Sequence, residues 1–360
     1  MSPRVLVAMS GGVDSSVAAA RLLAEGNDVV GVTLHLWDYP DDGSVKSRCC
    51  APEDVHDARR VADVLGFPHY AFDRRDLFAS EVVDPFVDAY LDGTTPSPCV
   101  RCNRGVKLKE LFHLAERLGA DYVATGHYAR VVEREGRHEL WRGADRSKDQ
   151  SYFLHMLDAE QLARLRFPLG AASKGEVRSE AQALALPGAR KGESQELCFV
   201  PSGRYDAFVA GRAGARVRPG PIVDAGGRVV GEHAGVHGFT VGQRKKLGVA
   251  LGERSYVVEI DPATSTVQLG PPAALLASGA ELRELALGAG VGLPLRCEVQ
   301  VRYRATPVAA EVSADGGGAT VRFDAPVSAV AKGQYAVFYA GERVLGGGLI
   351  TAALPAGAAA

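Results

Sequence analysis

The chain has 360 residues, 46% of them hydrophobic and 23% charged, which is typical of a globular protein with two or three domains. No apolar run reaches membrane-spanning length, and residues 1–9 lack the basic start and long apolar stretch of a signal peptide, so we expect a cytoplasmic protein that uses no membrane. The formal net charge of −2 means that any nucleic-acid site must be a local basic patch.

The first predicted elements enclose a glycine turn. An apolar run from Val5 to Met9 predicts a buried strand, and residues 15–25 predict an amphipathic helix that ends at Gly26. Between them lies the stretch SGGVDS (10–15). Glycines let the backbone approach a ligand, and the free N–H groups of a helix start attract an anion. The turn therefore suits a pyrophosphate, although a plain tight connection between strand and helix is the alternative.

This turn lacks the two commonest phosphate-binding patterns. It contains neither G-x-x-x-x-G-K-[ST] nor G-x-G-x-x-G, which argues against a Walker loop and a dinucleotide site. The pattern S-G-G-x-D-S resembles the PP-loop of the ATP-pyrophosphatases, which cleave ATP to AMP and pyrophosphate while adenylating a carbonyl oxygen. The resemblance implies that the turn binds ATP and that Asp14 helps to place a magnesium ion.

Strand and helix patterns alternate through the first half of the chain. Further strands are predicted at 28–36, 67–72 and 122–125, and further helices at 52–65, 76–91 with a bend at Pro85, 106–118 and 173–186. This alternation predicts a Rossmann-like α/β fold with a doubly wound parallel sheet. Ligands of such sheets bind at the carboxyl ends of the strands, where the glycine turn lies.

The pattern changes near residue 213, where glycine and proline become frequent and hydrophobic residues alternate with polar ones. Hairpins are predicted at 221–232 and 256–269, and strands at 295–304, 308–314, 320–323, 335–339 and 343–350. We therefore predict a PP-loop catalytic domain at 1–212, a small central β domain at 213–280, a C-terminal β-barrel at 281–354 and a disordered tail at 355–360.

The six cysteines are spread unevenly, at positions 49, 50, 99, 102, 198 and 297. This is not the framework of a secreted disulfide-rich protein, and it indicates thiol or metal chemistry in the cytosol. Cys102 lies near the start of a predicted helix with Arg101, Arg104 and Lys107 close in sequence. Both features lower the pKa of a thiol and favour the reactive thiolate.

Two kinds of chemistry stay open for Cys99, Cys102 and Cys198. In one, a cysteine carries a persulfide and another resolves it by forming a disulfide. In the other, all three thiolates hold a [4Fe–4S] cluster whose open iron carries an extra sulfide. Either route delivers sulfur to an activated carbon, and an ATP-pyrophosphatase loop in the same domain supplies the activation.

The chain resembles the tRNA-specific 2-thiouridylase family over nearly its whole length. The resemblance rests on SGGVDSS (10–16), TPSPCVRCN (within 94–103), LGADYVATGHYAR (118–130), KDQSYFL (148–154), SQELCFVP (194–201), VGQRKKLG (241–248), VRYR (301–304) and GQYAVFYAGERVLGGG (333–348). It implies synthesis of 2-thiouridine at the wobble position, U34, of tRNA. In this reaction ATP adenylates the uracil O2, and a cysteine persulfide then displaces AMP.

The resemblance also implies roles for the matching positions. Cys102 becomes the nucleophile and Cys198 the persulfide carrier. Asp14 is the third residue for which a catalytic role is implied. ATP contacts are implied for Ala8, Met9, Ser10, Gly11, Gly12, Val13, Asp14, Ser15, Leu34 and Gly126. Contacts with the target base are implied for Ser97, Pro98 and Cys99, and contacts with tRNA for His127, Lys148, Asp149, Gln150, Arg302, Tyr303 and Gln334. Some members carry Asp where this chain has Cys99, so the cluster alternative stays open.

The expected partners are the anticodon arm of tRNA and a cysteine desulfurase or sulfur-relay protein as sulfur donor. The expected cofactors are ATP and Mg²⁺, with the [4Fe–4S] cluster as the alternative above. Two rival functions also remain: another ATP-pyrophosphatase, such as a ligating or amidating synthetase, and a non-catalytic RNA-binding protein. Formation of AMP and pyrophosphate in the presence of tRNA separates the enzymes from the binding protein.

Overall fold

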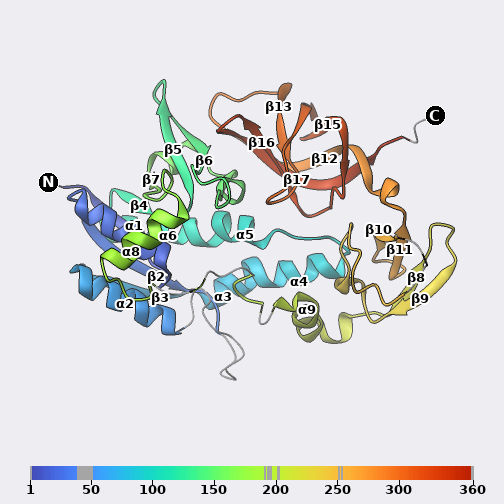
Figure 1. Ribbon diagram of the computed structural model, residues 1–360, viewed down its shortest axis with the longest axis horizontal. Coiled ribbons are helices and arrows are strands. Elements are labelled where there is room, and N and C mark those ends of the chain that lie inside the picture. Colours follow the sequence, from blue (N-terminus) through green and yellow to red (C-terminus); the bar gives the residue numbers. More distant parts are fainter. Residues whose placement is uncertain are drawn as a thin grey trace. The chain divides into compact units, whose positions relative to one another are not determined.

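The computed structural model describes residues 2–38, 52–189, 192, 197–200, 203–249, 252 and 254–357, and its elements can be followed in Figure 1. The chain divides into two compact units. The first unit comprises Met1–Val83, Cys99–Gly203 and Glu342–Val344, and the second comprises Asp84–Pro98, Arg204–Gly341 and Leu345–Ala360. These units group segments by proximity, and the limits of the three predicted domains stay a prediction.

The first unit is built on a parallel sheet with the strand order β3-β2-β1-β4-β7. The strands are β1 (Arg4–Ala8), β2 (Asp28–His35), β3 (His69–Asp73), β4 (Tyr122–Ala124) and β7 (Leu165–Arg166). Every pairing between neighbours is parallel. The predicted parallel sheet is confirmed, and it places the carboxyl ends of β1 and β4 side by side.

Helices cover both faces of this sheet, as doubly wound folds require. The helices of this part of the chain are α1 (Val13–Ala24), α2 (Pro52–Leu65), α3 (Arg75–Phe78), α5 (Pro98–Arg101), α6 (Leu108–Arg117), α7 (Ala159–Ala163) and α8 (Lys174–Ala183). Of these, α1, α2, α6 and α7 contact strands of the sheet. Val5 and Val7 pack with Ala19 of α1 and Ala58 of α2 on one face. Because side chains alternate along a strand, Ala8 points to the other face, where it lines a pocket together with Leu108 of α6.

Two π-helical turns interrupt the predicted helices. The helical run over 75–91 contains the π turn Ala79–Val83 between α3 and α4 (Asp84–Leu91). Pro85 cannot donate a hydrogen bond to the carbonyl four residues earlier, which accounts for an irregularity just ahead of it. A second π turn, Cys102–Lys107, lies between α5 and α6. Periodicity predicted the first run as one helix at 76–91 and the second run only from residue 106, and it located neither π turn.

The antiparallel hairpin β5 (Ala129–Arg134) and β6 (Arg137–Arg142) also belongs to the first unit. This hairpin was not predicted from the sequence. A 3-10 turn at Ser151–Leu154 follows. The helix predicted from residue 173 starts with a capping box: Ser173 accepts a hydrogen bond from the backbone of Glu176, and the Glu176 carboxylate accepts one in return.

The second unit contains α4, α9 (Tyr205–Ala213) and a four-stranded sheet of order β10-β11-β8-β9. Its strands are β8 (Gly220–Val223), β9 (Val229–His233), β10 (Tyr256–Asp261) and β11 (Thr266–Gly270). Both predicted hairpins are confirmed. Ile222, Phe239 and Val257 form part of the buried core of this sheet.

The same unit contains an antiparallel barrel with the strand order β12-β15-β14-β13-β16-β17, closed by pairing of β12 with β17. Its strands are β12 (Leu276–Leu287), β13 (Leu295–Gln300), β14 (Val308–Asp315), β15 (Gly318–Ser328), β16 (Tyr335–Ala340) and β17 (Arg343–Pro355). The predicted barrel is confirmed, although β12 was missed. β17 includes Pro355, the first residue of the predicted tail, and residues 358–360 lie outside the described residues.

Within the described ranges, no helix has both the length and the apolar character needed to cross a lipid bilayer.

Candidate active site

The turn after β1 has a backbone that requires glycine at one position. Gly11 has a φ of +69°, and a Cβ there would lie 2.3 Å from the carbonyl oxygen of Asp54. Gly12 is the N-cap of α1, and no side chain among the described residues caps the first N–H groups of that helix. The turn therefore has both features inferred from the sequence: a close backbone approach and a helix start open to an anion.

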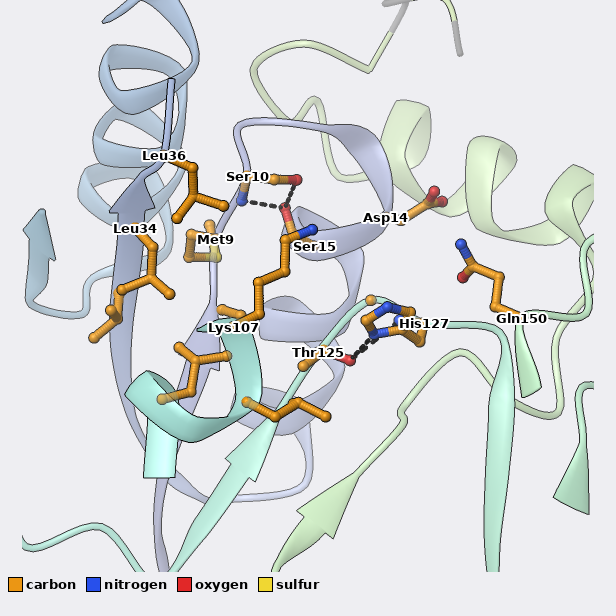
Figure 2. Close-up of a pocket in the computed structure, with 15 residues that line it drawn as sticks. Met9, Ser10, Asp14, Ser15, Leu34, Leu36, Lys107, Thr125, His127 and Gln150 are labelled. Carbon is orange, nitrogen blue, oxygen red and sulfur yellow. Dashed lines mark hydrogen bonds between the residues drawn. The ribbon is translucent and has the colours of Figure 1, made fainter. Parts of the chain in front are cut away.

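The two serines of the turn bind to each other and to its backbone. Ser15 Oγ donates to the Gly12 carbonyl at 3.0 Å and accepts from the Ser10 backbone N–H at 3.2 Å. The two hydroxyl oxygens lie 3.3 Å apart (Figure 2). These bonds hold the loop in its curved shape. Ser15 therefore shapes the turn, a role that the sequence analysis did not assign to it.

A pocket opens between this turn and the end of β4. It is lined by Ala8, Met9, Ser10, Asp14, Ser15, Val32, Leu34, Leu36, Lys107, Leu108, Leu111, Thr125, Gly126, His127 and Gln150. Leu34 and Leu36 from the end of β2 lie on one side, and Asp14, His127 and Gln150 lie on the other (Figure 2). An apolar wall facing a polar one suits a flat base joined to phosphates.

Most of the predicted ATP contacts line this pocket: Ala8, Met9, Ser10, Asp14, Ser15, Leu34 and Gly126. Gly11, Gly12 and Val13 belong to the same turn. Leu36 and Lys107 are lining residues that the sequence analysis did not name. His127 and Gln150, for which contacts with tRNA were implied, line this pocket too.

Gly126 is required for a reason other than ligand approach. A Cβ at this position would lie 2.9 Å from both the carbonyl carbon of Asp14 and the backbone nitrogen of Ser15. The end of β4 therefore packs directly on the first turn of α1. Any larger residue at 126 pushes against the phosphate-type turn itself.

Asp14 is held by two side chains from distant parts of the chain. Lys174 Nζ lies 2.6 Å and 2.8 Å from the two carboxylate oxygens, and the Tyr128 hydroxyl donates to Oδ1 at 2.9 Å. Only 13% of the Lys174 side chain and 35% of the Asp14 side chain are exposed. The Lys174 backbone N–H also donates to Asp145 at 3.0 Å, which fixes the start of α8. Sequence reasoning missed Lys174, and its one local signal is that it follows the N-cap Ser173.

The His127 imidazole is neutral at physiological pH. Desolvation by burial lowers its pKa to about 3, and the positive charge of Lys107 adds to this effect. Its Nδ1 lies 2.6 Å from the Thr125 hydroxyl (Figure 2). At the pocket, His127 therefore acts as a polar group without a charge.

Cys102 belongs to the same helical run as one wall of the pocket. It is 5% exposed and is the first residue of the π turn that ends at Lys107. Lys107, Leu108 and Leu111 line the pocket. The run begins at Pro98, so Cys102 lies in its second turn, and π turns of this kind occur frequently at functional sites.

Cys198 is half-buried and precedes an aromatic anchor. The Phe199 ring packs against Phe78 of α3, with 5.6 Å between ring centroids, and against Trp37 at 6.3 Å. α3 in turn packs against the π turn that carries Cys102. A chain of packed groups therefore links the segment of Cys198 to the turn of Cys102.

Cys99, Cys102 and Cys198 are the candidate ligands of a metal cluster. Among the described residues, which include Cys99, Cys102 and Cys198, no three His, Cys, Asp or Glu side chains are grouped so that they could hold a metal ion. A [4Fe–4S] cluster needs three or four thiolates around one centre. Among the described residues, no group of three such side chains meets that requirement.

The residues implied to contact the target base are largely enclosed. Ser97 and Pro98 are buried, and Cys99 is half-buried. Asp149, implied to contact tRNA, is 8% exposed and accepts hydrogen bonds from Arg142, from the Gly143 backbone and from Ser151. Lys148 beside it is half-buried. The Asp149 carboxylate thus organises its own loop.

The remaining residues implied to contact tRNA lie in the second unit. Arg302 is exposed, and Tyr303 is half-buried with the guanidinium of Arg304 5.3 Å from its ring centroid. An exposed arginine beside an aromatic ring is typical of RNA-binding surfaces. Gln334 donates from its side-chain amide to the backbone carbonyls of Thr95 and Pro96.

Three family models match the chain: a tRNA methyl transferase HUP domain over residues 3–202, a tRNA methyl transferase PRC-barrel domain over 206–271 and an aminomethyltransferase beta-barrel domain over 285–350. The chain is 65% identical to tRNA-specific 2-thiouridylase MnmA of Sorangium cellulosum, over 99% of this chain and 94% of the relative. It is 49% identical to the protein of that name from Chloroflexus aurantiacus, over 96% and 98%.

Among solved structures, the NMN synthetase of Francisella tularensis aligns over 59% of this chain and 86% of its own, with 14% identity and a TM-score of 0.33. The identity to the sequence relatives is much higher and extends over almost the full length of both chains. The chain belongs to the tRNA-specific 2-thiouridylase MnmA family.

Proposed function

We propose that this chain makes 2-thiouridine at the wobble position of tRNA, using ATP to activate the uracil and a cysteine persulfide to supply the sulfur. Membership of the MnmA family supports the activity as tRNA thiolation. The single geometric observation that carries the proposal is the helical run that begins at Pro98. It contains Cys102 and then continues into the wall of the nucleotide-type pocket at Lys107, Leu108 and Leu111.

ATP is the expected occupant of that pocket. Leu34, Leu36 and Leu111 suit the adenine, and the open start of α1 suits the phosphates. In nucleotide sites a magnesium ion is usually held by one or two carboxylates together with substrate phosphates. Asp14 is the carboxylate of the turn and fits that role. When bound, the ion would neutralise phosphate charge, and Lys174, which pairs with Asp14, would add a positive charge beside that carboxylate.

The proposed reaction has two stages. The uracil O2 attacks the α-phosphorus of ATP, diphosphate leaves, and C2 now carries AMP as a good leaving group. The terminal sulfur of a Cys198 persulfide then attacks C2 and AMP leaves. The Cys102 thiolate attacks the inner sulfur, which forms a Cys102–Cys198 disulfide and releases the thiolated base. A thiol reductant returns both cysteines to free thiols, and the sulfur donor then loads Cys198 with a new persulfide sulfur.

A persulfide on Cys198 is preferred over a cluster on Cys99, Cys102 and Cys198, because the described donors are not grouped to hold a metal. The persulfide requires a sulfur donor, for which a cysteine desulfurase or a sulfur-relay protein is the proposed source. The RNA partner is the anticodon arm, with U34 turned out of its stack so that it can reach the pocket. Ser97, Pro98 and Cys99 are proposed to face that base.

The test compares four variants, Cys102→Ser, Cys198→Ser, Cys99→Ser and Cys297→Ser, with ATP, tRNA, cysteine and a cysteine desulfurase. We expect the first two to lose 2-thiouridine while diphosphate release continues, because adenylation needs neither thiol. Cys99→Ser should retain thiolation. Cys297 is the control: it lies on β13, and burial raises the pKa of its thiol to about 11, so it stays protonated.

The outcomes separate the alternatives. Full 2-thiouridine formation by Cys102→Ser or Cys198→Ser contradicts the sulfur-transfer assignment. Loss of thiolation in Cys99→Ser together with the other two favours the three-thiolate site. Intact ATP in the presence of wild-type protein and tRNA favours the RNA-binding protein, and AMP formation on a small carboxylate without tRNA favours the synthetase.

A further inference from the structure

The segment that leads to Cys99 is fastened to one turn of the barrel. The Thr95 backbone N–H donates to the Lys332 carbonyl at 2.8 Å. The side-chain amide nitrogen of Gln334 donates to the carbonyl of Thr95 at 2.9 Å and to that of Pro96 at 3.3 Å. Residues 332–334 therefore bind the N–H and the carbonyl of Thr95 and the carbonyl of Pro96. We call this set of contacts the 332–334 staple. Its residues all belong to the second unit.

Gly333, between the two bonding residues, makes the close approach possible. It has a φ of +88°, and a Cβ there would lie 2.9 Å from the Thr95 oxygen and 3.0 Å from its carbonyl carbon. No residue with a side chain fits here unless one backbone moves away from the other. The contact therefore uses three neighbouring residues: the backbone carbonyl of Lys332, the absent side chain of Gly333 and the side-chain amide of Gln334.

The barrel side of the staple is rigid. The Gly333 N–H donates to the Ile350 carbonyl at 2.9 Å, and the Ile350 N–H donates to the Gln334 carbonyl at 2.8 Å. These bonds join the turn to β17, and Tyr335 that follows is buried at the start of β16. The turn is therefore part of the barrel's own hydrogen-bond ladder.

The other side of the staple is stiff as well. Thr94 is tied back to the end of α4, because its backbone N–H and its hydroxyl both donate to the Ala89 carbonyl at 2.9 Å. Pro96 and Pro98 fix two φ angles on either side of the buried Ser97. With so few free dihedral angles, the position of Thr95 sets the position of Ser97 and Pro98.

We propose that the 332–334 staple positions the segment Ser97–Cys99 for the target base, and that Gln334 acts through this segment on the placement of Cys102. The inference rests on the proposed function, since it takes Cys102 as the nucleophile. Gln334 is then a positioning residue: its amide nitrogen is engaged by two carbonyls in the RNA-free protein. A barrel that binds RNA thereby holds the loop that presents the base.

The experiment uses Gln334→Glu, which keeps the shape of the side chain but removes the N–H donor. Gln334→Ala removes the whole contact. The matched control is Lys332→Ala, because the staple uses only the backbone carbonyl of Lys332. Hydrogen exchange of a peptide covering 94–98 is measured in the RNA-free protein, with a peptide covering β16 as the internal reference. Steady-state thiolation of tRNA is measured in parallel.

We expect both Gln334 variants to exchange faster at 94–98 while β16 exchanges as in the wild type. Their kcat for thiolation should fall about tenfold, as loss of two backbone-directed hydrogen bonds predicts, while the KM for tRNA changes less than about threefold. Lys332→Ala should match the wild type in exchange at 94–98 and in kcat. This separation of kcat from KM distinguishes positioning from a plain RNA contact.

A Gln334→Glu variant with wild-type exchange at 94–98 overturns the staple. So does a variant that raises only the KM for tRNA, because Gln334 is then an RNA contact alone. Faster exchange in β16 as well means that the barrel has loosened, and that also contradicts a local role. If the wild type makes no 2-thiouridine, the proposed function fails, whereas the exchange measurement still decides whether the staple exists.

Discussion

At the scale of single residues, Asp14 shows how one side chain of the phosphate-type turn depends on the rest of the fold. Its position after two glycines marks it as a candidate in the sequence. Its partners, Tyr128 and Lys174, lie 114 and 160 residues away. No local pattern encodes such a pairing. Asp14 could therefore be identified from the sequence, whereas its partner Lys174 could be identified only from the fold.

We predict that Lys174→Met lowers diphosphate release by about two orders of magnitude, the usual effect of removing one positive donor at a site of developing charge. The substitution keeps the length of the side chain but leaves the Asp14 carboxylate without its nearest cation. Lys174→Arg should recover part of the rate. ATP turnover in the presence of tRNA measures both variants. A rate for Lys174→Met within about twofold of the wild type contradicts a role for Lys174 in the site.

Gly126 is constrained by a contact that the local sequence does not reveal. The resemblance implied an ATP contact, and the residue does line the pocket. The stronger constraint on its identity is the backbone of Asp14 and Ser15, 2.9 Å from where a Cβ would lie. This contact cannot be inferred from the local sequence, because Gly126 and Asp14 are more than a hundred residues apart.

At the scale of elements, the short turn Ser151–Leu154 is closed by a histidine that folding holds neutral. His155 is 3% exposed, and its Nδ1–H donates to the Tyr152 carbonyl at 2.8 Å. Desolvation lowers the pKa of His155 to about 4, against an ordinary value near 6.5. The unfolded chain therefore takes up this proton at a higher pH than the folded chain does.

This difference predicts the sign of a stability change with pH. The contribution of neutral His155 to the free energy of unfolding is fully present above about pH 6.5. It declines as pH falls toward 4, because only the unfolded state gains the proton in that range. Between pH 7.5 and 5.0 the free energy of unfolding should lose on the order of 2 kcal/mol from His155 alone. His155→Gln should reduce the measured loss by about that amount in urea titrations. The exposed His113, changed to Gln, is the control, and an equal reduction there contradicts the assignment.

The elements that were not predicted are those whose local sequence favours a different structure from the one that the chain adopts. β12 contains the stretch AELRELAL, whose leucines, glutamates and alanines favour a helix. The chain nevertheless forms a strand there, because pairing with β15 and β17 closes the barrel and leaves no open edge. The π turn at Cys102 was missed for a related reason: periodicity detects a helical run but not one extra residue within it.

At the scale of the whole molecule, RNA binding must be reconciled with a net charge of −2. A protein with no overall positive charge binds a polyanion only through local basic groups, and each phosphate that it neutralises releases counterions. Arg302 and Arg304 flank Tyr303 in an exposed stretch of the second unit. The affinity for tRNA should therefore fall steeply with salt.

We predict that Arg302→Ala makes the plot of log K against log salt concentration shallower by about 0.7 to 0.9, the contribution of one phosphate contact. Filter binding of tRNA between 50 and 200 mM salt, the range over which phosphate contacts weaken strongly, measures the slope. Arg296→Ala is the matched control, because its guanidinium already pairs with Asp324 at 2.7 Å. An unchanged slope for Arg302→Ala removes this residue from the phosphate contacts.

The sequence by itself determined the features that depend on neighbours along the chain. The alternation of strand and helix, the glycine turn with its helix start, the hairpin β8–β9 with glycine at its tip and the capping box at Ser173 were all predictable, because short-range sterics and hydrophobic periodicity govern them.

Only the tertiary structure decided which distant groups meet. The pairing of Lys174 with Asp14 spans 160 residues, and the contact of Gln334 with Thr95 spans 239. Such contacts arise when sheets and helices pack, and the one-dimensional order of residues does not specify where two surfaces come together. Packing also left the three cysteines ungrouped as metal ligands within the described residues, although their types alone were compatible with a cluster.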